Sequence, residues 1–330
     1  MKNTAAVIAI LVGLGTFSGT SVAQNGSKHA ELFPQRPVRW IAPFPPGGAA
    51  DIVSRLIGQK LTEAWGQQIV VDNRPGAGGN LGTEIAARAA PDGYTVVLVP
   101  ATFTTYPSLT KKPAYDPLKD FVPITLVSSS PLILVVNPSL PVKGVQELIA
   151  LAKAKPRELN YASSGIGASA HMAAELFKSM TRTEIVHVPY KGQPQAILDL
   201  ISGRIQMMFP NIPVSLPHIR AGKLRALAVT TAKRSVLFPG LPTVSESGLT
   251  GFEVTQWSGL LAPAGTPGAI VGKYQRDIAM VLNLPDVRQN LANQGFEAVG
   301  STPGEFSDYI KAEIIKWTKV IREAGIRLDY

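Results

Sequence analysis

The stretch Pro43-Phe44-Pro45-Pro46-Gly47-Gly48-Ala49-Ala50-Asp51 joins a predicted strand, residues 38–42, to a predicted helix. Apolar residues at positions 52, 53, 56, 57 and 61 recur at helical spacing. The prolines stiffen the turn, and the two glycines let a ligand approach the backbone closely. The unpaired N–H groups of the first helical turn can hold a carboxylate or phosphate. These residues alone fit either an anion-binding loop or an ordinary rigid connection.

The first 23 residues are typical of a secretory signal peptide. Lys2 is followed by an apolar run, residues 5–14, and by small residues that end in Ser21-Val22-Ala23, which predicts cleavage between Ala23 and Gln24. The apolar run is shorter than the roughly 20 residues that span a bilayer. No cysteine follows to carry a lipid anchor. We therefore expect a soluble, exported mature protein.

Composition narrows the classes of function. Removing 23 of the 330 residues leaves a length that suggests two domains of about 150 residues each. The absence of cysteine excludes disulfides, thiol catalysis and thiolate metal sites. The net charge is +9, or +8 without Lys2, and comes from scattered basic residues. This pattern predicts weak attraction to small anions or membrane partners, and no nucleic-acid binding.

Apolar runs alternate with helical patterns along the chain. A predicted strand at 68–71 precedes the glycine-rich loop 73–80, and another at 94–99 ends in Ala101-Thr102-Phe103. Repeated strand-loop-helix units predict parallel, doubly wound sheets. Ligands of such sheets bind at the carboxyl ends of the strands.

The second half of the chain repeats this strand-loop-helix pattern. A strand at 159–162, the turn Ser163–Ser169 and an amphipathic helix follow one another, and Thr302–Glu305 forms a capping box before a C-terminal helix. The chain is expected to cross between domains near 121–136 and to return near 252–262. The expected organisation is a signal peptide at 1–23, domain I at 24–125 plus 253–330, and domain II at 126–252.

The turn Ser163–Ser169 resembles the first loop in its chemistry. It also joins a strand to a helix N-terminus, with two glycines and three hydroxyl groups. If the two domains face each other, the two loops can clamp a ligand with one or more carboxylates, chiefly through backbone N–H groups.

Catalytic and cofactor motifs are weak or absent. Gly165-x-Gly167-x-x-Ala170 is a poor match to a dinucleotide fingerprint, and there is no Walker-type phosphate loop. Without a G-x-S-x-G elbow, Ser169 with His171 is not a recognisable hydrolase pair, although an exported serine hydrolase stays as an alternative. The four histidines lack metal-ligand spacing. We expect no catalytic residue, metal or cofactor, and interpret His171 as a structural hydrogen-bonding residue.

Several motifs together carry a resemblance to a known family. They are the opening stretch with Asp51, Asn73-Arg74-Pro75-Gly76-Ala77-Gly78-Gly79, Pro91-Asp92-Gly93-Tyr94, Tyr115-Asp116-Pro117 with Asp120-Phe121, Tyr161-Ala162-Ser163-Ser164-Gly165-x-Gly167, His187-Val188-Pro189-Tyr190-Lys191-Gly192, Arg225-Ala226-Leu227-Ala228-Val229-Thr230, and Ala262-Pro263-Ala264-Gly265-Thr266-Pro267. From Pro37 to the C-terminus the chain resembles the Bug-type periplasmic receptors of tripartite tricarboxylate transporters.

The resemblance implies a type II periplasmic-binding-protein (Venus flytrap) fold, with two doubly wound α/β domains around a ligand cleft. It implies a periplasmic receptor, not an enzyme, that captures a mono-, di- or tricarboxylic acid. The receptor would deliver this acid to the membrane subunits of a transporter. Nothing in the sequence demands more than a monomer, so a monomer is the expected state. A receptor that signals to a membrane sensor is an open alternative.

The resemblance also implies which residues bind the ligand. A ligand carboxylate is held by Gly48–Asp51, partly through ordered water, and faces the loop Ser163–Ser169, while Phe44 flanks the ligand and Thr102 lines the pocket. The residues expected to bind are Phe44, Gly48, Ala49, Ala50, Asp51, Thr102, Ser163, Ser164, Gly167, Ala168, Ser169 and Asn211.

One position departs from the family pattern. After Met208-Phe209 the family commonly has an acidic or amide residue, whereas this chain has Pro210 and then Asn211. Loss of a carboxylate removes an acceptor for an amino group. We therefore expect a plain carboxylic acid as ligand, and not an amino acid.

Overall fold

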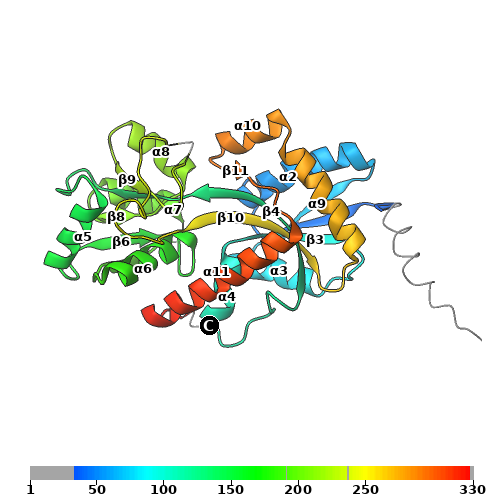
Figure 1. Ribbon diagram of the computed structural model, residues 1–330, viewed down its shortest axis with the longest axis horizontal. Coiled ribbons are helices and arrows are strands. Elements are labelled where there is room, and N and C mark those ends of the chain that lie inside the picture. The colour runs from blue at the N-terminus through cyan, green and yellow to red at the C-terminus, as the bar shows by residue number, and fades with distance from the viewer. Residues whose placement is uncertain (1–32, 191, 236–237, 328–330) are drawn as a thin grey trace, which may run out of the picture.

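The computed structural model describes residues 33–190, 192–235 and 238–327. The predicted signal peptide and its cleavage site lie outside these residues, as does Lys191. The described chain forms two α/β lobes, each built on its own sheet, and two long strands run between them (Figure 1). We call them the first lobe and the second lobe.

The first lobe contains a six-stranded sheet in the order β11-β4-β10-β3-β1-β2. Strands β2, β1 and β3 are parallel, whereas β10 runs antiparallel to both β3 and β4. The strands are β1 (Val38–Ala42), β2 (Ile69–Asn73), β3 (Thr95–Pro100), β4 (Phe121–Pro131), β10 (Thr255–Pro263) and β11 (Glu297–Ala298).

The second lobe contains a five-stranded sheet in the order β7-β6-β8-β5-β9. Here β7, β6 and β8 are parallel, and β5 is antiparallel to β8 and β9. The strands are β5 (Ile133–Val136), β6 (Asn160–Ser163), β7 (Val186–Pro189), β8 (Met207–Met208) and β9 (Arg225–Val229).

Both sheets contain parallel and antiparallel strands. The prediction of purely parallel sheets from the repeated strand-loop-helix units was wrong on this point. The cause in the first lobe is the crossing itself. Strand β4 leaves this lobe and β10 returns to it, so the two pair in opposite directions over most of their lengths. The alternation of strands and helices along the sequence does not show whether two strands will pair in parallel or antiparallel.

Helices cover both faces of each sheet (Figure 1). None of those in the described ranges is long and apolar enough to cross a membrane. They are α2 (Ala49–Trp65), the 3₁₀ turn η1 (Ala77–Gly79), α3 (Asn80–Ala87), α4 (Thr102–Leu109), α5 (Val145–Ala154), α6 (Ser169–Thr181), α7 (Gln193–Ile201), α8 (Ile212–Arg220), α9 (Gly268–Leu282), α10 (Pro285–Asn293) and α11 (Pro303–Ala324).

Helix α4 was not predicted from the sequence. Its sequence, TFTTYPSL, contains three threonines and Pro107, which are poor helix formers. The helix packs against α11, where Ser108 Oγ and Thr318 Oγ1 are 2.7 Å apart. Tertiary packing therefore stabilises a helix that local propensity disfavours.

Helix α11 belongs to the cores of both lobes. It begins with the predicted capping box, in which Thr302 Oγ1 accepts from Glu305 N and Glu305 accepts from Thr302 N. Phe306 near its start packs with Trp257 of the first lobe, and Trp317 near its end packs in the core of the second. The helix thus runs along the connection between the lobes (Figure 1).

Candidate functional site

The first loop, residues 43–48, is held by two polar side chains, of which Asp51 is buried and Asn73 half-buried. Asp51 Oδ2 accepts from Gly47 N at 2.9 Å, and Asp51 Oδ1 accepts from Asn73 Nδ2 at 3.0 Å. Asn73 Nδ2 also donates to Phe44 O at 3.0 Å. Asp51, at the start of α2, and Asn73, at the end of β2, therefore fix the loop from both ends.

The Asp51 carboxylate is turned into the loop. The residue is 3% exposed, and Arg55 lies 2.9 Å from Oδ1. Burial opposes ionisation, but the hydrogen bonds from Arg55, Gly47 and Asn73 outweigh it and hold the pKa of Asp51 below its usual value. Because the pKa is lowered on folding, this stabilisation is complete at neutral pH and is lost only as pH falls through the lowered pKa.

Replacing this carboxylate tests its role in the loop. In Asp51→Asn one acceptor becomes an NH₂ group facing donors, so we expect the free energy of unfolding to fall by about 2 kcal/mol. Urea denaturation at pH 7 measures this loss. Asp308→Asn is the matched control, because the Asp308 side chain is 79% exposed and forms a surface ion pair with Lys311, so its loss should be about 0.5 kcal/mol or less. Equal losses in the two variants would contradict a supporting role for Asp51.

Phe44 and Thr102 meet around the glycine-rich loop that precedes α3. A Cβ on Gly79 would lie 3.2 Å from Phe44 Cζ, so the ring packs directly on this glycine. Thr102 Oγ1, at the start of α4, donates to Gly78 O at 3.3 Å. The structure therefore brings the loops after β1, β2 and β3 together at one edge of the first sheet.

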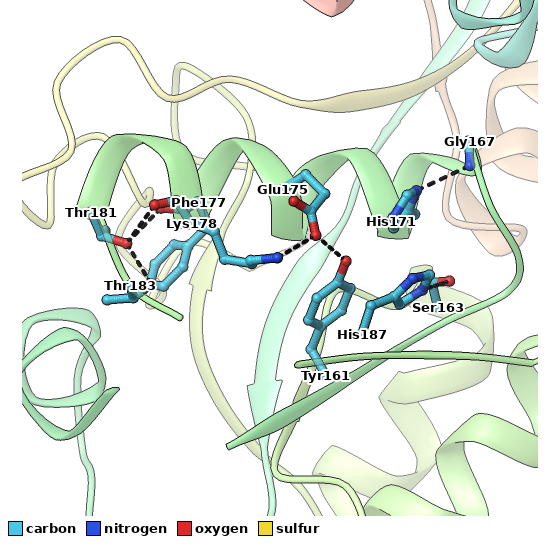
Figure 2. Close-up of polar contacts among 10 residues, drawn as sticks. All are labelled: Tyr161, Ser163, Gly167, His171, Glu175, Phe177, Lys178, Thr181, Thr183 and His187. Carbon is cyan, nitrogen blue, oxygen red and sulfur yellow. Dashed lines mark hydrogen bonds and ion pairs between the residues drawn. The ribbon is translucent and has the colours of Figure 1, made fainter. Parts of the chain in front are cut away.

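The second loop, residues 163–169, keeps its first hydroxyl inside (Figure 2). Ser163 is fully buried; its Oγ accepts from Gly165 N at 3.2 Å and lies 2.7 Å from His187 Nε2. Ser164 and Ser169 are half-buried. The Ser163 hydroxyl therefore supports the loop and does not face solvent.

Gly167 is the point where the second loop touches the first lobe. Thr105 Oγ1 of α4 donates to Gly167 O at 3.4 Å. Gly167 has φ +78°, and a Cβ there would lie 2.6 Å from Leu109 Cδ1 of α4. Ser169 lines a cavity of about 10 Å³ at this contact, together with Ala101 and Thr105.

Asn211 lies at the same edge of the second sheet as the second loop. It follows β8, which pairs in parallel with β6, and it is the N-cap residue of α8. Asn211 N donates to Gln193 Oε1 at 3.0 Å. The carboxyl ends of β6 and β8 thus present Ser163–Ser169 and Asn211 side by side.

The structure also shows supporting residues that the sequence interpretation left out. Asn73 lies in a quoted motif, but its role depends on its position beside Phe44 and Asp51. No sequence pattern pointed to the role of Thr105, because the helix that carries it, α4, was not predicted. His187 lay in a quoted motif, yet only the fold shows that it reaches Ser163.

His171, the histidine of the hydrolase alternative, makes a hydrogen bond with the second loop. Within residues 33–190, 192–235 and 238–327, no group of three histidine or acidic residues could hold a metal. His171 Nδ1 accepts from Gly167 N at 3.1 Å, so this atom is already engaged. The interpretation of His171 as a structural hydrogen-bonding residue is confirmed.

Comparisons with known proteins agree on one family. The family model described as "Tripartite tricarboxylate transporter family receptor" matches residues 53–326. Protein BugT of Bordetella pertussis is 39% identical over 322 residues, which cover 97% of this chain and 98% of that protein.

Two solved structures show the same fold. Rpa4515 of R. palustris, solved with adipate, has a TM-score of 0.77 and 39% identity, and the match covers 89% of this chain and 99% of that one. MatC from Rhodopseudomonas palustris, solved with bound malate, has a TM-score of 0.74 and 32% identity over 88% of this chain and 100% of that one.

Proposed function

We propose that this chain, which belongs to the family of tripartite tricarboxylate transporter receptors, captures a small carboxylate in the periplasm and delivers it to the membrane subunits of its transporter. The periplasmic-binding-protein fold predicted from the sequence is confirmed by the similarity to family structures. The members of this family are substrate-binding receptors, and this protein is therefore a receptor and not an enzyme. The observation that best supports carboxylate capture is the placement of one glycine-containing loop and helix N-terminus on each lobe.

The proposed mechanism is closure of the lobes on an anion. Helices α2 and α6 begin directly after the two loops, so their first-turn N–H groups and positive dipole ends can share a carboxylate or bind one each. Only a closed cleft brings both loops onto the ligand. Binding therefore shifts the equilibrium between open and closed forms toward the closed form.

We propose that the binding residues act in two ways. Asp51 and Ser163, whose polar atoms are used inside their own loops, shape the site. Direct contacts with the ligand or its ordered water are proposed for Phe44, Gly48, Ala49, Ala50, Thr102, Ser164, Gly167, Ala168, Ser169 and Asn211.

We further propose that the ligand is a plain carboxylic acid. The relatives solved with adipate and malate hold acids without an amino group. Position 211 supplies an amide and no carboxylate to receive an ammonium group. Tight binding of an amino acid, with weak binding of its des-amino analogue, would overturn this proposal.

The remaining proposals concern the whole chain. We propose cleavage between Ala23 and Gln24, a monomeric mature protein, and domains at 24–125 plus 253–330 and at 126–252. Helix α11 lies in the first of these segments but contributes Trp317 to the core of the second lobe.

A thermal-shift screen of residues 24–330 tests the function. The panel contains mono-, di- and tricarboxylates, aromatic acids, and amino acids with their des-amino analogues. A ligand present at 100 times its Kd should stabilise the protein by about 2.7 kcal/mol. Hits confined to carboxylates would support the receptor. A panel without hits, after any co-purified ligand is removed, would contradict carboxylate capture.

Substitutions in the loops test whether backbone groups form the site. Gly167→Ala adds a Cβ against Leu109 at a positive φ, and Gly48→Ala places one 3.3 Å from Pro45 O. We expect both to weaken binding more than Ser164→Ala, which removes at most one neutral hydrogen bond of about 0.5–1.5 kcal/mol. Calorimetry with the acid found in the screen measures the three affinities. Equal affinities would contradict a site built from backbone groups.

A further inference from the structure

Three aromatic rings stack behind the second loop (Figure 2). Tyr161 comes from β6, His171 from α6 and His187 from β7. The His171 and His187 ring centroids are 4.2 Å apart with planes 21° from parallel, and Tyr161 lies 4.7 Å from His187. The stack joins two strands and a helix beneath residues 163–169.

Each histidine binds one end of the loop. His187 Nε2 lies 2.7 Å from Ser163 Oγ at the start of the loop. His171 Nδ1 accepts from Gly167 N at 3.1 Å near its end. Gly167 is also the residue that contacts Thr105 and Leu109 of the first lobe. The two imidazoles therefore fix the part of the second lobe that meets the first.

The hydrogen bond from Gly167 requires a neutral His171. An imidazolium carries a proton on both ring nitrogens, so its Nδ1–H would face the Gly167 N–H, and the bond would be lost. A charged His187 would likewise place a cation against the His171 ring. The contact with Gly167 therefore depends on the protonation state of His171, and a charge on His187 would disfavour the stack that holds His171 in place.

Two charged groups of α6 lie near the stack and act on the histidines in opposite senses, Lys178 against the charged form and Glu175 in favour of it at His187. Glu175 of α6 accepts from Tyr161 OH and from Lys178 Nζ, so its charge is already paired. Lys178 Nζ lies 5.5 Å from the Tyr161 ring centroid. Helix α11 directs Glu323 to Ser179, about two turns along α6 from His171.

Burial and the nearby positive charge of Lys178 both lower the pKa values of the two histidines. Burial is the main cause that lowers the pKa of His171 to about 3 and that of His187 to about 4. His187 also lowers the pKa of His171, whereas Glu175 partly opposes the shift at His187. Both rings are thus neutral at pH 7.

We propose that His171 and His187 are positioning residues that hold the Ser163–Ser169 loop in its binding conformation, and that the bond to Gly167 forms only while His171 is a neutral imidazole. This inference rests on the proposed function, because it assigns the loop to the ligand cleft. A neutral pair leaves affinity unchanged from pH 7.5 down to about 5. Protonation of the pair below that range releases the loop and weakens binding.

Amide side chains provide variants that keep the hydrogen bonds without titrating. Asn at position 171 places an oxygen where Nδ1 lies, and Gln at position 187 reaches the site of Nε2. We expect His171→Ala and His187→Ala to bind the carboxylate about tenfold more weakly at pH 7.5. His171→Asn and His187→Gln should recover most of this loss. His218→Gln, on α8 and outside the stack, is the control and should bind as the unmodified protein does.

The pH profile separates a positioning role from a merely structural one. Calorimetry from pH 7.5 to 3 is run on each protein at every pH where circular dichroism shows it to be folded, and ionisation of the ligand affects all of them equally. The double variant His171→Asn/His187→Gln should lose less affinity at pH 3 than the unmodified protein. Identical profiles, or alanine variants with unchanged affinity, would overturn the inference.

A second readout does not need a ligand. Nitrogen-15 NMR of the histidine rings should show His171 Nδ1 without a proton at pH 7, and the Gly167 amide signal should shift in His171→Ala but little in His171→Asn. A protein that binds no carboxylate but gives these spectra would refute the proposed function and leave the loop positioning intact. A protonated Nδ1 at pH 7, or a Gly167 signal unchanged in His171→Ala, would refute the positioning itself.

Discussion

Gly259→Ala is expected to lower the free energy of unfolding by about 3 kcal/mol, because the added methyl group overpacks a core with no room for it. A Cβ at Gly259 would lie 2.0 Å from Phe306 Cζ and 2.6 Å from Phe306 Cε1. Phe306 is fully buried and packs edge-on against Trp257 at a centroid distance of 5.7 Å. Because Phe306 is fully buried, its ring has little free space into which it can move.

A double-mutant cycle assigns this loss to one contact. Phe306→Leu alone should destabilise the protein by leaving a cavity, but it also opens space beside position 259. The double variant should therefore be more stable than the sum of the two single losses predicts, by at least about 1 kcal/mol. Gly268→Ala, where a Cβ meets nothing within 4 Å, is the control. Additive losses in urea denaturation would contradict the assigned contact.

Gly82→Ala is expected to damage both stability and binding. A Cβ at Gly82 in α3 would lie 2.8 Å from Pro43 Cβ, 3.0 Å from Pro43 Cα and 2.9 Å from Arg74 O. Because two of these atoms are backbone, no side-chain rotation relieves the overlap. We expect a loss of about 2–3 kcal/mol in the free energy of unfolding. Displacement of Pro43 should also weaken carboxylate binding about tenfold, or by about 1.4 kcal/mol.

The matched control for this variant is Gly272→Ala in α9. It is the same change inside a helix, but its Cβ would meet only the end of the Arg276 side chain, at 3.3 Å. Because alanine has a greater helix propensity than glycine, the free energy of unfolding of this variant should equal that of the unmodified protein or exceed it by up to about 1 kcal/mol. Urea denaturation and calorimetry on both variants decide the outcome. Normal affinity in Gly82→Ala would show that α3 does not position the first loop.

The local structure of the two loops could be predicted from local chemistry. The run from Pro43 to Asp51 indicated a strand, a rigid turn and a helix start, and α2 begins at Ala49 as such a turn requires. The turn Ser163–Ser169 was predicted in the same way, and α6 begins at Ser169. Both predictions depend on residues close together in the chain, where proline, glycine and helix periodicity act directly.

The direction in which polar side chains point could not be predicted. Asp51 and Ser163 were expected as ligand contacts, and the structure turns their oxygens toward Gly47, Asn73, Gly165 and His187. A buried polar atom takes whichever partner the fold places within reach. Asn73 and His187 are 22 and 24 positions away from the residues they hold, so no local pattern could reveal these pairs.

The sequence by itself determined the α/β class of the fold, its alternating strands and helices, and the two glycine-containing loops, because these follow from periodicity and turn residues; the receptor family followed from the resemblance of the motifs. Only the tertiary structure decided that the sheets are mixed, that the Thr102–Leu109 segment is helical, and that Gly167 meets α4. Each of these depends on contacts between distant segments. Their free energy comes from burial and hydrogen bonding that exist only after the chain has folded.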